Sequence, residues 1–265
     1  MKLRIGNLII KFNDKPFLGP IESTFESGHL NLIVGRSGCG KSTLLKLIAG
    51  FHSDYTGALA LDDDYFNSEG NVALAFQNPE SLFFNSSVFE EISYSLKVTD
   101  KKDNIEELTK SWMLKWGIAP EVYSNKYPFK LSGGEKRRVA LAACTILQPK
   151  IILLDEPLAG LDRVGQNDLS QIITSLSKEH IIIVVTHEPE LLLDQTTNVL
   201  FLNNQQTQEY DYNSFLCNCI NNPDFYPLPE WYTSFLKPYA YYNNLPLVNA
   251  KSVAEFITRI SNESA

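Results

Sequence analysis

Four residues near the N-terminus have the types and spacing of a phosphate-binding loop. Gly35, Gly40, Lys41 and Ser42 fit the pattern G-x-x-x-x-G-K-[ST]. Glycines let the backbone wrap tightly, so that its N–H groups point at phosphate oxygens. Lys41 would then bridge β- and γ-phosphates, and Ser42 would supply a hydroxyl ligand to Mg²⁺. An ordinary glycine-rich turn is the alternative, and the preceding strand and following apolar helix argue against it.

A second group of candidate residues lies where apolar runs end in polar side chains. In "IILLDEP", Asp155 would hold Mg²⁺ through water and Glu156 would polarise the attacking water. Two adjacent carboxylates can also form a solvated turn, but their pairing with a phosphate loop favours the catalytic interpretation. Gln77 could reach the metal and the water, and His187, after "IIIVV", could contact the γ-phosphate. Taken alone, each of these two would more often be an ordinary loop or strand-end residue.

A second pair of glycines follows Ser132 at a predicted helix start. Ser132 and Glu135 have the spacing of a capping box, so a well-capped helix is the simplest interpretation of "LSGGE". However, Gly133 and Gly134 are unfavourable in a first helical turn and leave backbone N–H groups uncovered, where an anion could approach. The phosphate loop already has its own donors. This helix tip would therefore suit the γ-phosphate of a nucleotide held by a second copy or a partner, which would make ATP the link between two subunits.

The expected elements place these residues in an α/β fold. Residues 29–35 have the pattern of a short buried strand that leads through the glycine loop into a helix at 42–50. The runs at 151–155 and 181–185 have the length and continuous apolar character of parallel strands that are buried on both faces. Between 88 and 130 the pattern changes to helical spacing with charges, which predicts an inserted helical subdomain.

Composition limits the classes of protein that fit. The chain has 265 residues, 44% of them hydrophobic, and its net charge of −8 argues against nucleic-acid binding, which needs a basic surface. The basic stretch "EKRR" at 135–138 is expected on a solvated helix face. No apolar run approaches the roughly 18 residues of a membrane span, and no signal peptide is recognisable, so a cytosolic location is expected. Reduced thiols are expected from the spacing of the cysteines, which are Cys39, Cys144, Cys217 and Cys219.

The C-terminal part of the chain differs in composition from the rest. Beyond about residue 203 it is enriched in Asn, Gln, Tyr and Pro. Near the end, "SVAEFITRI" has a capping box from Ser252 to Glu255, and its apolar residues fall on one helical face. That face must pack on this chain or on a neighbour. We therefore expect a domain at 1–205, with the helical subdomain at about 88–134, and a C-terminal extension at 206–265.

Together, "LSGGEKRRVALA" and "IILLDEPLAGLD" resemble the signature, Walker B and D-loop motifs of the ABC ATPase family. The resemblance covers roughly residues 2–205 and implies a P-loop NTPase core. By this resemblance, residues 35–42 are the Walker A loop, and Phe12 is the aromatic residue that stacks on adenine. The resemblance also implies that two subunits pair head to tail, so that the signature motif of each closes the ATP site of the other. Residues 158–162 would then lie across the interface between the two subunits.

The resemblance implies a full set of site residues. Catalysis would involve Glu156, His187 as the switch histidine, and Gln77 as the Q-loop glutamine. Mg²⁺ would be held by Ser42, Gln77 and Asp155. The ATP-binding set is Phe12, Gly35, Arg36, Ser37, Gly38, Cys39, Gly40, Lys41, Ser42, Thr43, Ser132, Gly133, Gly134 and Glu135. The role of Cys39, and whether both sites of a pair hydrolyse ATP, stay open.

Within the family, "FQNPESLFFNSSVFEEISYSL" is similar to the Q-loop segment of energy-coupling-factor and cobalt-type importers. The tail is similar to an extension that, in that group, helps hold the ATPase pair together. These similarities imply an ATPase subunit that is peripheral on the inner face of the cell membrane. It would pair with a second ABC ATPase subunit, identical or related, and with integral membrane transport subunits. The substrate would be a vitamin or metal ion, which another chain selects.

Proteins with other functions would have similar motifs. The main alternative is a soluble ABC ATPase that acts as an assembly scaffold, as in iron-sulphur cluster systems. DNA-repair members are disfavoured because no long coiled coil interrupts the chain, and translation factors because only one cassette is present. A small-molecule kinase would explain the Walker A loop but not "LSGGE".

Overall fold

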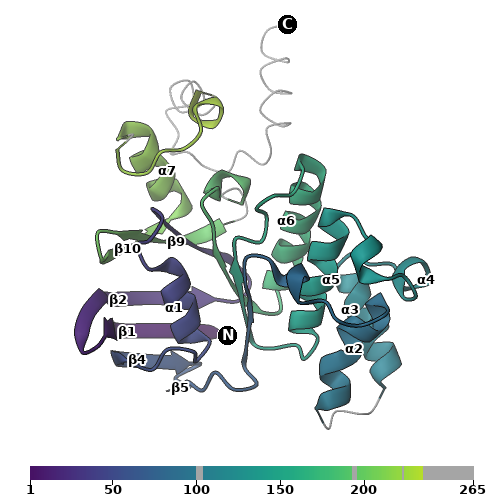
Figure 1. The fold of residues 1–265 in the computed structure, drawn as a ribbon. Helices are drawn as coiled ribbons and strands as arrows, with labels where there is room; N and C mark the ends of the chain where they lie inside the picture. Colours follow the sequence, from purple (N-terminus) through teal and green to yellow (C-terminus); the bar gives the residue numbers. More distant parts are fainter. Residues whose placement is uncertain (100–103, 193–195, 223, 235–265) are drawn as a thin grey trace, which may run out of the picture.

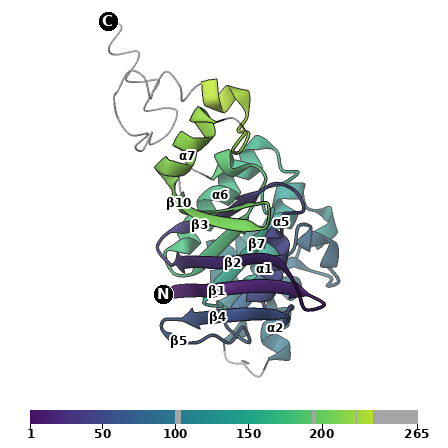
Figure 2. The same cartoon turned by 90° about the vertical axis from the view of Figure 1, so that its left-hand side faces the viewer.

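The described part of the chain contains two β-sheets and a group of helices (Figure 1). It comprises residues 1–99, 104–192, 196–222 and 224–234 of this computed structural model. The first sheet is antiparallel, with the order β2-β1-β4-β5, and Figure 2 shows its strands side by side. Its strands are β1 (Lys2–Phe12), β2 (Lys15–Glu26), β4 (Tyr55–Leu61) and β5 (Asp64–Tyr65).

The second sheet is the predicted parallel sheet, with the order β10-β9-β3-β8-β7-β6. All its neighbouring strands run parallel except the first pair. Its strands are β3 (Leu30–Gly35), β6 (Val72–Ala75), β7 (Ile151–Asp155), β8 (Ile181–Val185), β9 (Thr196–Asn203) and β10 (Gln206–Asp211). Strands β3 and β8 are buried along their whole length, as expected of strands covered on both faces. The predicted α/β fold is confirmed.

The parallel sheet separates two hydrophobic cores. Along β7, Ile152 and Leu154 face one core, while Ile151 and Leu153 face the other, because successive side chains of a strand point to opposite faces. The first core includes side chains of α2, α3, α5 and α6, and the second includes α1 and the antiparallel sheet. These helices are α1 (Lys41–Ile48), α2 (Val88–Val98), α3 (Ile105–Lys115), α5 (Gly133–Thr145) and α6 (Arg163–Ser177).

The region between β6 and α5 is helical, as its charge and apolar spacing predict. It contains α2, α3 and the short α4 (Pro120–Tyr123), together with the 3₁₀ turns η1 (Pro79–Leu82) and η2 (Pro128–Lys130). The Trp112 indole N–H donates to the carbonyl of Ala142 and to Oγ1 of Thr145. This buried contact joins α3 to α5, so the helical subdomain is tied to the signature helix.

The C-terminal part begins inside the parallel sheet. The boundary suggested near residue 205 falls in the turn between β9 and β10, so residues 206–211 form the edge strand of the sheet. Helix α7 (Tyr212–Asn221) follows. The helix expected at 252–260 lies outside the described residues. None of the described helices is long and apolar enough to cross a membrane.

Candidate active site

The Walker A loop joins the carboxyl end of β3 to the start of α1. A Cβ on Gly35 would lie 2.4 Å from the Leu202 carbonyl oxygen, so no side chain fits there. Gly40 has φ +107°, which side chains disfavour, and its Cβ would lie 2.9 Å from Leu18. The Lys41 ammonium is buried and donates to the carbonyl oxygens of Gly35 (2.8 Å) and Arg36 (3.1 Å). The two glycines are therefore required by the tight path of the loop around its lysine.

A pocket of about 300 Å³ lies over this loop and gathers most of the predicted residues. The carboxyl ends of β3, β6, β7 and β8 meet at the same edge of the sheet, which is where α/β proteins bind ligands. This topology brings together residues from four distant parts of the sequence. The pocket is lined by Phe17, Ser37, Gly38, Gly40, Lys41, Ser42, Thr43, Gln77, Asp155, Glu156, Val185 and His187.

Glu156 and His187 form the polar centre of the pocket. Glu156 is buried and has φ +52°, an unusual backbone conformation for a residue with a side chain. Its Oε2 accepts a hydrogen bond from the His187 amide (3.2 Å), and its Oε1 lies 3.3 Å from His187 Nε2. Burial raises the pKa of the Glu156 carboxyl above its ordinary value, and the hydrogen bond from the His187 amide opposes that rise. Such a carboxylate is suited to accept a proton from water.

The donor set of the pocket fits Mg²⁺. Ser42, Gln77 and Asp155 bring a hydroxyl, an amide and a carboxylate to the same lining, and oxygen ligands are those that Mg²⁺ prefers. Among the described residues, no group of three or more His, Cys, Asp or Glu side chains could hold a metal ion. Few protein ligands are expected, because Mg²⁺ at nucleotide sites is held by one or two side chains, phosphates and water.

Two aromatic residues lie near the loop, and only one of them lines the pocket. Phe12, the predicted adenine-stacking residue, is 45% exposed at the end of β1. Its ring centroid lies 5.0 Å from that of Phe17 and 4.9 Å from that of His52. Phe17 lines the pocket and packs against Gly40, where a Cβ would lie 3.1 Å from its ring. No motif marks Phe17 in the sequence, and the role of Phe12 stays a prediction.

The signature residues form a second, separate hollow of about 400 Å³. The predicted capping box is present: Ser132 Oγ accepts from the Glu135 amide (3.3 Å), and Glu135 Oε2 accepts from the Ser132 amide (2.8 Å). A Cβ on Gly133 would meet nothing within 4 Å, and one on Gly134 would lie 3.9 Å from Gly165. Packing within the described chain therefore does not require either glycine. The hollow shares no lining residue with the pocket over the Walker A loop, which we call the nucleotide pocket after its predicted ligand.

Arg137 corrects the expectation that "EKRR" lies on a solvated face. Its side chain is only 5% exposed, and its Nε lies 3.2 Å from Glu80 Oε2. It also donates to the carbonyl oxygens of Gln77 and Ala159. The available signal was helical spacing, because Arg137 precedes the buried Ala140 and Leu141 by three and four residues. Arg137 therefore connects the signature helix to the Q-loop and to the segment after β7.

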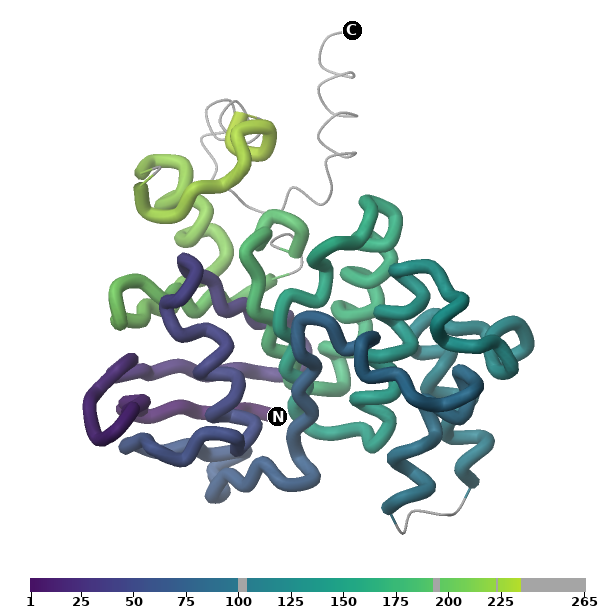
Figure 3. Tube along the Cα trace, in the orientation of Figure 1, coloured from purple at the N-terminus to yellow at the C-terminus, as the bar shows by residue number. Residues whose placement is uncertain are grey.

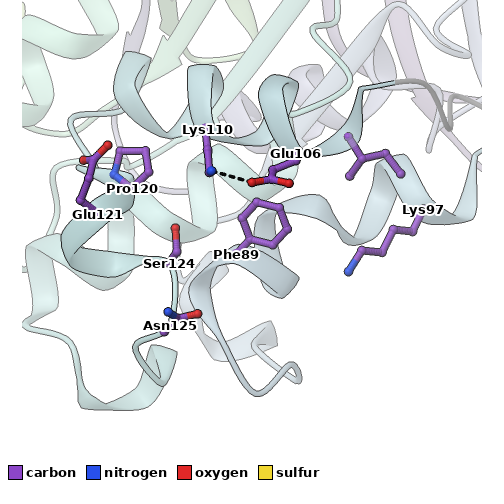
Figure 4. Close-up of a pocket in the computed structure, with 9 residues that line it drawn as sticks. Phe89, Lys97, Glu106, Lys110, Pro120, Glu121, Ser124 and Asn125 are labelled. Atoms are coloured by element: carbon purple, nitrogen blue, oxygen red, sulfur yellow. Dashed lines mark hydrogen bonds and ion pairs between the residues drawn. The ribbon is translucent and has the colours of Figure 1, made fainter.

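A third hollow, of about 640 Å³, lies within the helical subdomain (Figure 4). Side chains of α2, α3 and α4 line it, among them Phe89 and Glu121. Its Glu106 and Lys110 pair with each other at 2.6 Å, one turn apart on α3. The hollow shares no lining residue with the nucleotide pocket or with the signature hollow, so it is not part of either site.

Comparisons with known proteins agree with this geometry. The model of the ABC transporter family matches residues 18–159. The chain is 34% identical over 195 residues to the energy-coupling factor transporter ATP-binding protein EcfA2 of Thermotoga maritima, which covers 71% of this chain and 73% of that protein. It is 33% identical over 216 residues to the tungstate uptake system ATP-binding protein TupC of Peptoclostridium acidaminophilum. This match covers 80% of this chain and 99% of that protein.

A solved structure extends the likeness to the fold. The structure of cbiO1 from Clostridium perfringens, part of the ABC transporter complex cbiONQ, matches with a TM-score of 0.74 and 25% identity. The match covers 84% of this chain and 96% of that one. The chain therefore belongs to the ABC transporter family, as an ATP-binding subunit whose ATP hydrolysis is coupled to transport.

Proposed function

We propose that the chain is the ATPase subunit of an energy-coupling factor importer and that ATP is held between two such subunits. The observation that carries this proposal is the separation of two hollows on one chain. Lys41 and Glu156 line the first, and Gly133 and Gly134 line the second, with no residue in common. A head-to-tail pair would bring the glycine-led helix tip of one subunit to the phosphates bound by the other. The second subunit is either identical or related.

Six residues that line the nucleotide pocket have distinct roles in this proposal. Lys41 and the amides of its loop would bind the β- and γ-phosphates, and Ser42, Gln77 and Asp155 would hold Mg²⁺, which would supply positive charge beside the phosphates. Glu156 accepts a proton from the attacking water. His187, held beside Glu156 by its amide, contacts the γ-phosphate. ATP binding closes the pair, and hydrolysis reopens it.

A surface beside Gln77 is proposed to dock the membrane subunits. Phe76, Leu82 and Phe84 are exposed next to it along the chain, and Phe84 packs edge-on against the exposed Tyr94. Exposed apolar side chains that gather on a surface mark interaction sites, and Phe84 with Tyr94 is such a contact. Cytoplasmic helices of an integral membrane partner are the proposed occupant, which places the chain on the inner face of the membrane. Movement there would reach the signature helix, because Arg137 of α5 donates to the Gln77 carbonyl.

A vitamin or metal ion is the proposed substrate class. Support comes from the Thermotoga relative, which is named for energy-coupling factor transport, and from cbiO1, part of cbiONQ. The Peptoclostridium relative is named for tungstate uptake, at a similar identity. Relatives with similar identity to this chain are therefore named for different uptake systems. This supports the proposal that another chain selects the substrate.

Co-purification from the native membrane tests the proposal. We expect integral membrane proteins to accompany the chain, and a Phe84→Asp variant to lose them while still hydrolysing ATP. Val122→Asp is the matched control, because Val122 is 55% exposed, against 64% for Phe84, but lies on α4 and not in the Q-loop segment. Recovery of a soluble partner, with no membrane protein, would contradict an importer and favour the assembly scaffold.

A further inference from the structure

The segment after α7 returns to the nucleotide pocket, although it lies outside the residues that the family model matches. It lies at the upper end of the molecule in Figure 3, in yellow-green. Two of its residues contact loops of the site, and a third contacts the first residue of α6. Arg36 of the Walker A loop donates to the Asp224 carbonyl (3.4 Å), and the Arg163 guanidinium lies 5.4 Å from the centroid of the Trp231 ring. Between these two contacts, the Tyr226 hydroxyl donates to the carbonyl oxygen of His187 (3.0 Å).

The Tyr226 ring is held in one place by the core. It is 6% exposed, and its centroid lies 6.0 Å from those of Phe201 in β9 and Phe215 in α7. A buried tyrosine hydroxyl needs a hydrogen-bond partner, because leaving it unpaired is unfavourable. Burial raises the pKa of Tyr226, and the carboxylates of Glu190 and Glu156 raise it further, so the hydroxyl stays protonated as a donor. The fixed ring therefore directs a permanent donor at the His187 carbonyl.

His187 is thereby held on both sides of its α-carbon. Its amide donates to Glu156 Oε2 and its carbonyl accepts from Tyr226, so both flanking peptide groups are anchored to other elements. The imidazole between them lies with Nε2 3.3 Å from Glu156 Oε1. We propose that Tyr226 is a positioning residue that orients His187 beside Glu156. This inference rests on the catalytic roles that are proposed above for these two residues.

The proposal gives the C-terminal extension a part in the ATP site of its own chain. Tyr226 is not among the residues that line the nucleotide pocket, and it acts through the backbone of the loop that contains His187. Loss of its hydroxyl should leave ATP binding unchanged, because the Walker A contacts of Lys41 do not involve it. It should slow turnover, because the His187 carbonyl loses its partner and the loop gains freedom.

Tyr226→Phe tests the proposal, with kcat and KM for ATP measured alongside amide hydrogen exchange of residues 186–191. We expect kcat to fall roughly five-fold, the size expected for one hydrogen bond, with KM unchanged. The rate of amide hydrogen exchange in residues 186–191 should rise by a similar factor. Tyr210→Phe is the matched control: its ring centroid lies 6.2 Å from that of Phe215 in the same aromatic cluster, and its hydroxyl makes no hydrogen bond to a described residue. Thermal unfolding checks that both variants fold.

Two results would overturn the positioning role. One is unchanged turnover and exchange in Tyr226→Phe, and the other is an equal loss in Tyr210→Phe. Glu156→Gln and His187→Ala belong in the same series. Wild-type turnover in those two variants would remove their proposed catalytic roles, whereas exchange in 186–191 would still decide whether Tyr226 holds the loop.

Discussion

The nucleotide pocket and the signature hollow are built in different ways. Lys41, Glu156 and His187 follow three different strands: Lys41 is held by carbonyl oxygens of its own loop, and Glu156 and His187 contact each other across the ends of β7 and β8. The signature hollow is a helix tip where, among the described residues, the side chains of Ser132 and Glu135 form hydrogen bonds within the capping box and with Tyr123. The first region is completed by the fold of one chain. The second presents unshielded glycines, which makes sense if another subunit completes it.

The largest effect is expected in the nucleotide pocket, from Glu156→Gln. Loss of the carboxylate that accepts the water proton should reduce kcat by roughly 10²–10⁴-fold, the usual contribution of a general base. ATP affinity should be retained, so the variant should accumulate as an ATP-bound dimer in size-exclusion chromatography. Glu188→Gln, one residue past His187 and exposed, is the control. Normal turnover in Glu156→Gln would exclude this residue from the chemistry.

The next effect concerns Arg137, which connects the two regions. Arg137→Met leaves the Glu80 carboxylate, which is 25% exposed, without its partner, and loss of these charge-assisted hydrogen bonds should lower the free energy of unfolding by about 1.5–3 kcal/mol. Arg138→Met is the matched control, because Arg138 pairs at 3.6 Å with the half-exposed Asp168, a contact worth up to about 1 kcal/mol. Denaturant unfolding of both variants measures the difference. If both variants lose the same free energy of unfolding, the contacts of Arg137 stabilise the fold no more than those of Arg138.

A smaller effect distinguishes Phe12 from Phe17, the two aromatic residues near the Walker A loop. If Phe12 stacks on adenine, Phe12→Ala should raise KM for ATP roughly ten-fold, since base stacking contributes about 1–3 kcal/mol. KM for ATP should respond less to Phe17→Leu, which keeps an apolar side chain against Gly40. The opposite order would assign base stacking to Phe17.

The smallest effect concerns the signature hollow and depends on pH. The Tyr123 hydroxyl, then the Ser132 backbone, hold the pKa of Glu135 below its ordinary value. A lowered folded-state pKa gives stability above the unfolded-state pKa, and this stability is lost as pH falls through the folded-state pKa. Tyr123→Phe should therefore lower the melting temperature slightly near neutral pH, and the difference should shrink in acid. A pH-independent difference would mean that Tyr123 acts through packing alone.

The sequence predicted the parallel sheet and most of the nucleotide pocket, and it missed contacts between distant segments. Strand ends with polar residues identify Asp155, Glu156 and His187, because burial on both faces leaves a clear pattern. Phe17 and Tyr226 carry no such pattern, since their positions depend on packing across the fold. Arg137 was expected on a solvated face, because a charged residue in a sequence does not reveal a distant carboxylate partner such as Glu80.

The most direct test of the shared site is Gly134→Asp, with Gly6→Asp as the control at another uncrowded glycine. A side chain fits at Gly134 in this chain, so the fold should survive. The account predicts that ATP hydrolysis falls at least about a hundred-fold, because a carboxylate would face the partner's phosphates. ATP binding to the isolated chain should be unchanged. Undiminished hydrolysis, or an equal loss of ATP binding by the isolated chain, would contradict a nucleotide site that two subunits share.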